Sequence, residues 1–192
     1  MNKPVRFSRL IRFVYSFHVI FLGLLFFTSG MGKLYVDHRF PGLMGPPWLE
    51  ERLAEYQLGV FARFIGYAQI IIGYLMITWR LRRLAFLMLA PMLLNILVIT
   101  ISQAWRGTPW VVGFFILQLA FIFWVDRRQY LHLVIPGDHR PDPEPGTWFG
   151  LLAVVVGLFA VVASVSLSYV SLVSGWILSV LGIFIGIFAG RR

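Results

Sequence analysis

The stretch that decides the fold is Gly32–Gln69, which reads GKLYVDHRFPGLMGPPWLEERLAEYQLGVFARFIGYAQ. It separates the first strongly apolar segment of the chain from the second, and it mixes prolines with charged residues. Connections between the helices of a bundle usually take about 2–8 residues. A connector over residues 33–60 is too long to be a simple link, so we expect it to form structure of its own.

The composition around this stretch is that of a membrane protein. Of the 192 residues, 59% are hydrophobic and 13% are charged, whereas a soluble domain carries about 25% charged residues. Apolar runs of about 18–20 residues, long enough to cross a bilayer as helices, recur along the chain. The net charge of +9 comes from basic residues that flank these runs. That placement is typical of membrane proteins, so we expect the lipid bilayer, and no nucleic acid, as a partner.

Four apolar segments predict a four-helix membrane bundle over residues 1–130. The expected spans are Phe13–Met31, Phe61–Trp79, Leu84–Ile101 and Trp110–Val125. The first is too long for the apolar part of a typical signal peptide and is not followed by a cleavage site of small residues, so we expect a retained helix. The proline-rich residues 131–147 are expected to form a cytoplasmic loop that ends the bundle.

Residues 148–192 are apolar almost throughout and predict a terminal transmembrane hairpin. As one helix this segment would measure roughly 60 Å, twice the bilayer core, so it should fold back at Ser166–Ser174. Gly182, Gly186 and Gly190 recur every four residues, a spacing that lets helices approach closely. We expect the two helices to pack small face on small face. A homodimer through the same glycines is the alternative.

The basic residues set the expected orientation. With the N-terminus inside, twelve of the 17 Lys and Arg residues lie at the inner ends of the six spans. This excess is the usual bias of cytoplasmic segments. The sequence therefore predicts an all-α polytopic membrane protein with six spans, both termini cytoplasmic and the connector outside.

Polar side chains inside the spans are the candidate site residues. Gln69 shares a face of the second span with Gly66 and Gly73, so it should point into the bundle. Arg63 lies on the adjacent face, and Asn95 of the third span should reach a comparable depth. Polar groups in a membrane are costly and often functional. Two interpretations stay open, because each amide could simply bond another helix, and Arg63 could extend to the outer interface.

The connector itself predicts a short amphipathic helix. Pro46 and Pro47 suit the start of a helix, and Glu50 and Glu51 would then lie in its favourable first turn. The segment Trp48–Tyr56 has an apolar and a polar side, as a helix lying at a membrane surface does. It is either a surface anchor or a lid over the outer mouth of the bundle. As a lid, it would cover a pocket with a polar base.

Motifs for catalysis are missing from the sequence. It contains no HExxH pair, no phosphate-binding glycine loop and no serine nucleophile elbow, and its four histidines are scattered. The absence of cysteine excludes disulfides and thiolate metal sites. We therefore expect no catalytic residues and no metal site.

Two segments give the chain a family resemblance. FFTSGMGKL at residues 26–34 and FARFIGYAQ at residues 61–69, followed by Gly73–Arg83, resemble the DoxX-like family of small bacterial membrane proteins. The resemblance covers residues 10–130 and implies a four-helix bundle in the bacterial inner membrane. Some members are linked to quinone-dependent sulfur oxidation or to oxidative-stress assemblies, which implies quinone as a ligand and a membrane redox complex as a partner. The long connector and the added hairpin depart from the family.

The leading hypothesis is a non-catalytic bundle that binds a lipophilic small molecule or serves as an accessory subunit of a membrane redox complex. The candidate ligand-binding residues are Lys33, Arg63, Gln69 and Asn95. A small-molecule transporter is the second hypothesis, and a purely structural assembly subunit is the third. The short fourth span and the lack of carboxylates inside the spans argue against proton-coupled transport.

Overall fold

The computed structural model describes residues 9–78, 80–127, 130 and 148–190, and within these ranges the chain is helical with no strands. Five described helices are long and apolar enough to cross a membrane, namely α1 (Arg9–Leu34), α3 (Gly59–Ile77), α4 (Arg82–Ser102), α5 (Thr108–Val125) and α7 (Trp148–Ser168). α8 (Leu172–Gly190) is also apolar, over the shorter stretch Leu172–Phe188. The chain is a multi-pass helical membrane protein, as the composition indicates.

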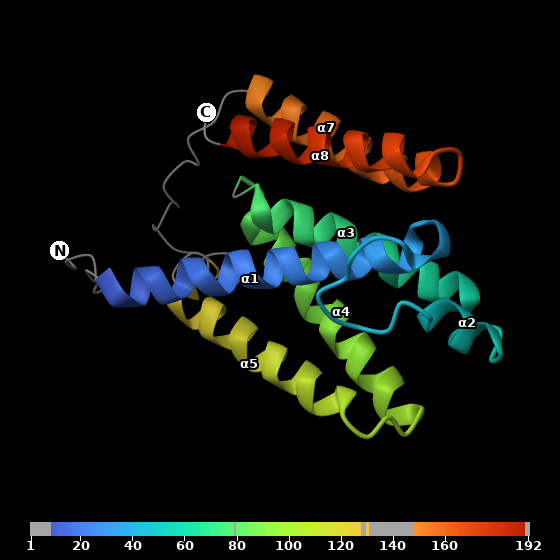
Figure 1. The fold of residues 1–192 in the computed structure, drawn as a ribbon. Coiled ribbons are helices and arrows are strands. Elements are labelled where there is room, and N and C mark those ends of the chain that lie inside the picture. The colour runs from blue at the N-terminus through green and yellow to red at the C-terminus, as the bar shows by residue number, and fades with distance from the viewer. Residues whose placement is uncertain (1–8, 79, 128–129, 131–147, 191–192) are drawn as a thin grey trace.

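The helices are arranged around a central pair (Figure 1). α1 and α3 run side by side in opposite directions, α4 and α5 cover one side of this pair, and the α7–α8 hairpin lies on the other side. α1 begins and α8 ends at the same end of the molecule. The proline-rich loop expected at residues 131–147 lies outside the described residues.

Two pairs of glycines hold α1 and α3 together. Gly23 and Gly30 of α1 face Gly73 and Gly66 of α3. A methyl group added to Gly30 would lie 2.5 Å from the carbonyl oxygen of Gly66, and one added to Gly73 would lie 2.6 Å from that of Gly23. Seven residues separate the glycines on each helix, so they recur on one face. Without hydrophobic driving force in lipid, such close backbone contact stabilises a helix pair by van der Waals packing.

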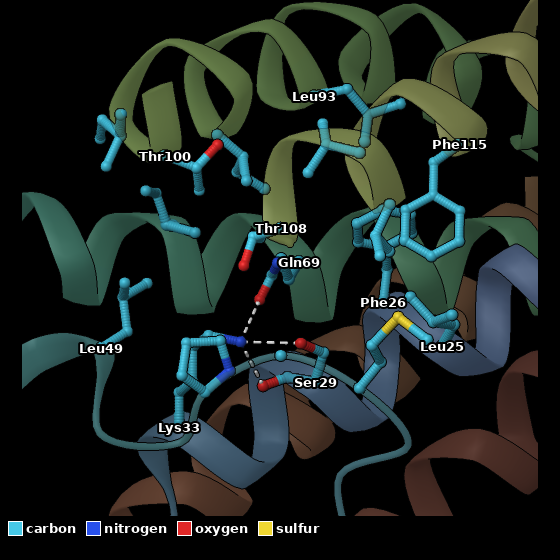
Figure 2. A pocket seen from close by; sticks show the side chains of 18 of the residues that line it. Leu25, Phe26, Ser29, Lys33, Leu49, Gln69, Leu93, Thr100, Thr108 and Phe115 are labelled. Atoms are coloured by element: carbon cyan, nitrogen blue, oxygen red, sulfur yellow. Dashed lines mark hydrogen bonds between the residues drawn. The ribbon is translucent and has the colours of Figure 1, made fainter. Parts of the chain in front are cut away.

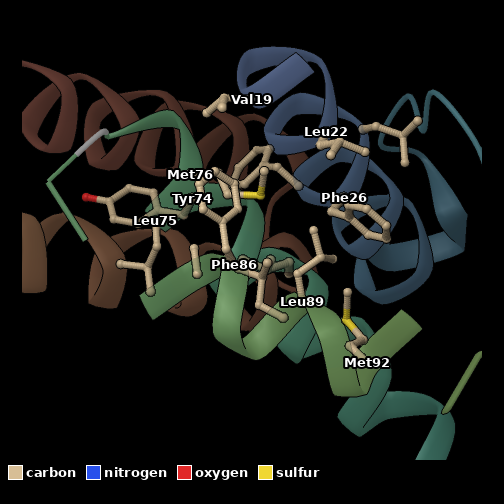
Figure 3. Close-up of a cluster of buried hydrophobic side chains, with 14 of the residues drawn as sticks. Val19, Leu22, Phe26, Tyr74, Leu75, Met76, Phe86, Leu89 and Met92 are labelled. Atoms are coloured by element: carbon tan, nitrogen blue, oxygen red, sulfur yellow. The ribbon is translucent and has the colours of Figure 1, made fainter. Parts of the chain in front are cut away.

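The apolar core lies where α1, α3 and α4 meet (Figure 3). It contains Val19, Leu22 and Phe26 from α1, Tyr74, Leu75 and Met76 from α3, and Phe86, Leu89 and Met92 from α4. Most of these side chains are almost fully buried. They fill the middle of the bundle and the end at which α3 stops and α4 starts.

The hairpin turns between Ser168 and Leu172, inside the serine-rich segment expected to bend. A methyl group on Gly157 would lie 2.6 Å from the Gly182 carbonyl oxygen, and the reverse distance is the same. The expected packing of small face on small face is therefore confirmed. Tyr74 of α3 docks the hairpin, because its hydroxyl donates to the carbonyl oxygen of Val154 at 3.0 Å.

A second tyrosine holds the hairpin at its turn. The hydroxyl of Tyr35, just after α1, lies 2.9 Å from Ser164 Oγ and 3.0 Å from the carbonyl oxygen of Gly175. Tyr169 adds a bond from its own hydroxyl to the carbonyl oxygen of Leu34 at 3.1 Å. The hairpin is thus joined to the bundle by directional bonds at two depths.

Candidate functional site

The bundle contains a cavity at the end where the connector lies, here called the connector end (Figure 2). Its volume is about 80 Å³, measured to the centres of water-sized spheres, where a single water needs roughly 10–15 Å³. α1, α3, α4 and α5 form the walls. The apolar lining includes Leu25, Phe26, Ile65, Leu93, Val112 and Phe115. A mostly apolar cavity with few polar groups is the usual form of a small-molecule site.

Three polar side chains form the base of this cavity. Lys33 Nζ donates to the carbonyl oxygen of Ser29 at 3.1 Å, to Ser29 Oγ at 2.7 Å and to Gln69 Oε1 at 3.1 Å. Lys33 is only 7% exposed and Gln69 only 4%. Lys33 and Ser29 are four residues apart on α1 and therefore share a face. Packing of α1 against α3 brings Gln69 to the same point.

The ammonium group fixes the orientation of the Gln69 amide. An ammonium donates but cannot accept, so the amide oxygen must face Lys33 and the NH₂ group must face away. No acceptor for that NH₂ group is found in the described part of the chain, and Figure 2 shows Gln69 between Lys33 and Thr108. Gln69 thus presents free N–H donors to the cavity.

The connector covers one end of the cavity. Met44, Gly45, Pro46 and Leu49 belong to its lining, and Leu49 starts the short helix α2 (Leu49–Ala54). Gly45 has a φ of +94°, and a methyl group there would lie 2.9 Å from Ser29 Oγ. Only glycine combines this backbone conformation with so close an approach. The lid interpretation of the connector agrees with this geometry, although Trp48 and Tyr56 are exposed.

A second hollow lies on the other side of Lys33. Lys33 lines it together with Tyr35, Asp37, His38, Glu50, Glu51, Ala54 and Tyr169. His38 belongs to the short helix η1 (Val36–His38). Its Nδ1 lies 3.1 Å from the carbonyl oxygen of Gly32 and its Nε2 lies 3.0 Å from Glu51 Oε1. The hydrogen bond to Glu51 raises the pKa of His38 above its usual value.

We expect the contribution of His38 to stability to fall as pH rises. Both ring nitrogens face acceptors, and only the protonated ring can donate from both. Because the pKa of His38 is raised, its stabilisation is complete below the ordinary value of about 6.5. It is lost as pH rises through the higher pKa of the folded state. The difference in melting temperature between the wild type and His38→Gln should shrink between pH 5.5 and 8.5.

The effect is small, since exposed ion pairs contribute up to about 1 kcal/mol. Arg52→Gln is the matched control, because it removes the exposed pair with Glu55 and involves no group that titrates near neutrality. Its difference from the wild type should stay constant over this range. A His38→Gln difference that is equally constant would contradict the prediction.

The structure separates the four predicted ligand-binding residues into two groups. Lys33 and Gln69 meet in the cavity. Arg63 does not line it, because its side chain is 64% exposed and its Nε pairs with Glu50 Oε1 at 2.5 Å. Asn95, which was predicted to reach a depth comparable to that of Gln69 and to belong to the site, is exposed on α4 and does not line the cavity. Because α4 is apolar on almost every side, its sequence does not indicate which face meets lipid. The single amide of Asn95 was therefore not enough to predict how the helix is rotated about its axis.

Three further polar residues belong to the site although they were not predicted as site residues. Ser29, Thr100 and Thr108 line the cavity, and only the four-residue spacing of Ser29 and Lys33 signals any of them. At the opposite end, Asp126 follows α5 directly and is buried, and it accepts a hydrogen bond of 2.6 Å from Tyr15 Oη. The guanidinium of Arg82 lies 5.6 Å from the centre of the Tyr15 ring. This cluster ties α1, α4 and the end of α5 together.

Comparisons of this chain with protein-family models, with curated proteins and with solved structures find no match. The DoxX-like resemblance therefore stays a prediction from residues 10–130. The cavity is therefore the feature of this chain that bears on its function.

Proposed function

We propose that this membrane protein binds a lipophilic small molecule in the connector-end cavity. The observation that carries the proposal is the pairing of apolar walls with one buried polar base, Lys33 and Gln69. Burying a lysine in apolar surroundings is expensive, and a purely structural helix pair has no need of it. The connector covers this base with Gly45 close above Ser29. A cover over a polar-based cavity is the arrangement of a binding site rather than of a packing defect.

A quinone, which the DoxX-like resemblance implies, fits these residues. Its ring suits the apolar walls, and a ring carbonyl could accept from the free NH₂ group of Gln69 or from Lys33 Nζ. When bound, a quinone would supply reversible electron transfer, as a subunit of a membrane redox complex requires. Transport is less well supported, because Leu22, Leu89 and Ile122 are fully buried between the cavity and the opposite end.

The membrane placement belongs to the same proposal. We place the chain in the bacterial inner membrane with six spans and both termini cytoplasmic. The five long helices and the apolar α8 support six spans. The common end at which α1 begins and α8 ends supports an even number of crossings.

We expect Gln69→Leu to lose a lipophilic molecule that co-purifies with the wild type. The variant should keep its fold, because leucine has a volume close to that of glutamine, and should lower the amount of bound molecule about tenfold, since it removes a hydrogen bond to the ligand and one to Lys33. The measurement is mass spectrometry of extracts from protein purified in mild detergent.

Asn95→Leu is the matched control for this experiment. It makes the same amide-to-leucine change on an exposed face of α4, outside the cavity lining. It should retain the co-purifying molecule at the wild-type amount. Equal retention by Gln69→Leu would contradict the proposed site, and equal loss in both variants would show that the effect is not local to the cavity.

A further inference from the structure

We infer that the ligand of the connector-end cavity is an amphiphile with an oxyanion head group, held by Lys33 and Gln69. This inference rests on the proposed function and specifies the chemistry of its ligand.

The described residues do not neutralise the charge of Lys33. Within the part of the chain that the structure describes, no carboxylate lies within ion-pair distance of Lys33. Glu50 and Glu51 line the neighbouring hollow, but Glu50 pairs with Arg63 and Glu51 with His38. The nearby acids are thus committed to other cations. An ammonium buried without a counter-charge is costly, and an anion in the cavity would offset that cost.

Hydrogen bonding alone does not replace a counter-ion. The ammonium has three N–H groups, and the three acceptors from Ser29 and Gln69 satisfy them. These acceptors carry no formal charge. Either a neutral carbonyl or an oxyanion would therefore have to displace one of them, but only the oxyanion would add a charge that offsets the buried ammonium.

The Gln69 amide supplies the second donor. Its oxygen is held by Lys33, so its NH₂ group faces the cavity. An ammonium and an amide donor beside each other match the two oxygens of a carboxylate or two oxygens of a phosphate. A hydroxyl or a single carbonyl offers only one oxygen to these two donors and therefore makes fewer hydrogen bonds with them.

The apolar walls of the cavity indicate that the rest of the ligand is an apolar chain. Apart from the polar base and two threonines, the lining is apolar. Val111 lines the cavity and is also 37% exposed on α5, and Ile99 is partly exposed on α4. An acyl chain longer than the cavity therefore has a route to the bilayer between these helices. A single-chain amphiphile suits this shape.

The test is titration calorimetry on the full-length protein in phosphatidylcholine nanodiscs, with the heat from empty nanodiscs subtracted. The probes are dodecanoate, dodecyl phosphate, dodecanol and decylubiquinone. We expect the two anions to bind about tenfold or more tightly than dodecanol. Preference between the two anions shows whether a carboxylate or a phosphate is the better head group.

Variants locate the effect at Lys33. Lys33→Met should bring dodecanoate down to the affinity of dodecanol and leave dodecanol unchanged. Gln69→Glu places a carboxylate beside Lys33 inside the protein, so it should keep the fold and abolish the preference for anions even if Lys33→Met does not fold. Arg39→Met removes an exposed cation paired with Asp37 and should change neither affinity by more than about twofold.

The outcomes separate this inference from the proposed function. If dodecanol or decylubiquinone binds as tightly as dodecanoate, or if Gln69→Glu keeps the anion preference, the oxyanion inference is overturned and the lipophilic site stands. If none of the four probes gives heat above empty nanodiscs, the proposed function itself fails.

Discussion

Replacing Gly73 with leucine is expected to leave the protein without a stable fold. Gly73 lies at the closest approach of α3 to α1, where an added methyl group would overlap the backbone nitrogen of Phe27 and lie 2.6 Å from the Gly23 carbonyl oxygen. Overpacking against side chains costs about 1–3 kcal/mol. Here the obstacle is backbone inside a helix, which cannot rotate away, so we expect a loss above about 3 kcal/mol.

The measurement is the yield and apparent melting temperature of the variant in mild detergent at a fixed heating rate. Gly113→Leu is the matched control, because a methyl group on Gly113 of α5 meets nothing within 4 Å. It should behave as the wild type. A Gly73→Leu protein that melts within a few degrees of the wild type would mean that α1 and α3 do not pack through these glycines.

The α1–α3 contact also shows which features of the fold could be predicted from the sequence and which could not. Each apolar segment becomes a helix because a membrane span must satisfy its backbone hydrogen bonds internally. Spans could therefore be predicted from hydropathy, and the structure keeps them with small shifts, such as α5 starting at Thr108 rather than Trp110. The shared face of Gly66 and Gly73 was visible in the sequence. Their partners Gly23 and Gly30 were not identified, because no sequence pattern says which two helices touch.

Two of the four predicted site residues, Lys33 and Gln69, line the cavity, and the other two do not, for the same reason. Gln69 lies on a face crowded with glycines, and glycines mark the side of a helix that meets another helix. Asn95 lies on α4, whose lipid side and core side are equally apolar, so its direction could not be inferred. The ion pair between Arg63 and Glu50 could not be predicted, because the two residues come together only when the connector folds. Lys33 is buried because the connector turns back over it at Gly45.

Replacing Gly186 with leucine is expected to detach the hairpin from the bundle without unfolding the bundle itself. A methyl group on Gly186 would collide with the hydroxyl of Tyr74 and lie 2.6 Å from Thr78 Cγ2. Tyr74 would have to move, and its hydrogen bond to the carbonyl oxygen of Val154 would break. Because a side chain can shift where backbone cannot, we expect a smaller loss than at Gly73. We expect a loss of about 1–3 kcal/mol in stability, which corresponds to a fall in melting temperature of roughly 3–10 °C.

Two measurements test this expectation together. The melting temperature in detergent should fall, and a tyrosine-to-phenylalanine change at Tyr74 in the Gly186→Leu background should add little further loss, because the bond that it removes is already broken. Ala163→Leu is the matched control, since it enlarges an exposed alanine on α7, and it should melt as the wild type does.

An unchanged melting temperature for Gly186→Leu would place this glycine face against lipid and reopen the alternative of a homodimer through Gly182 and Gly186. Full additivity of the Tyr74 and Gly186 changes would instead show that the hairpin docks through other contacts.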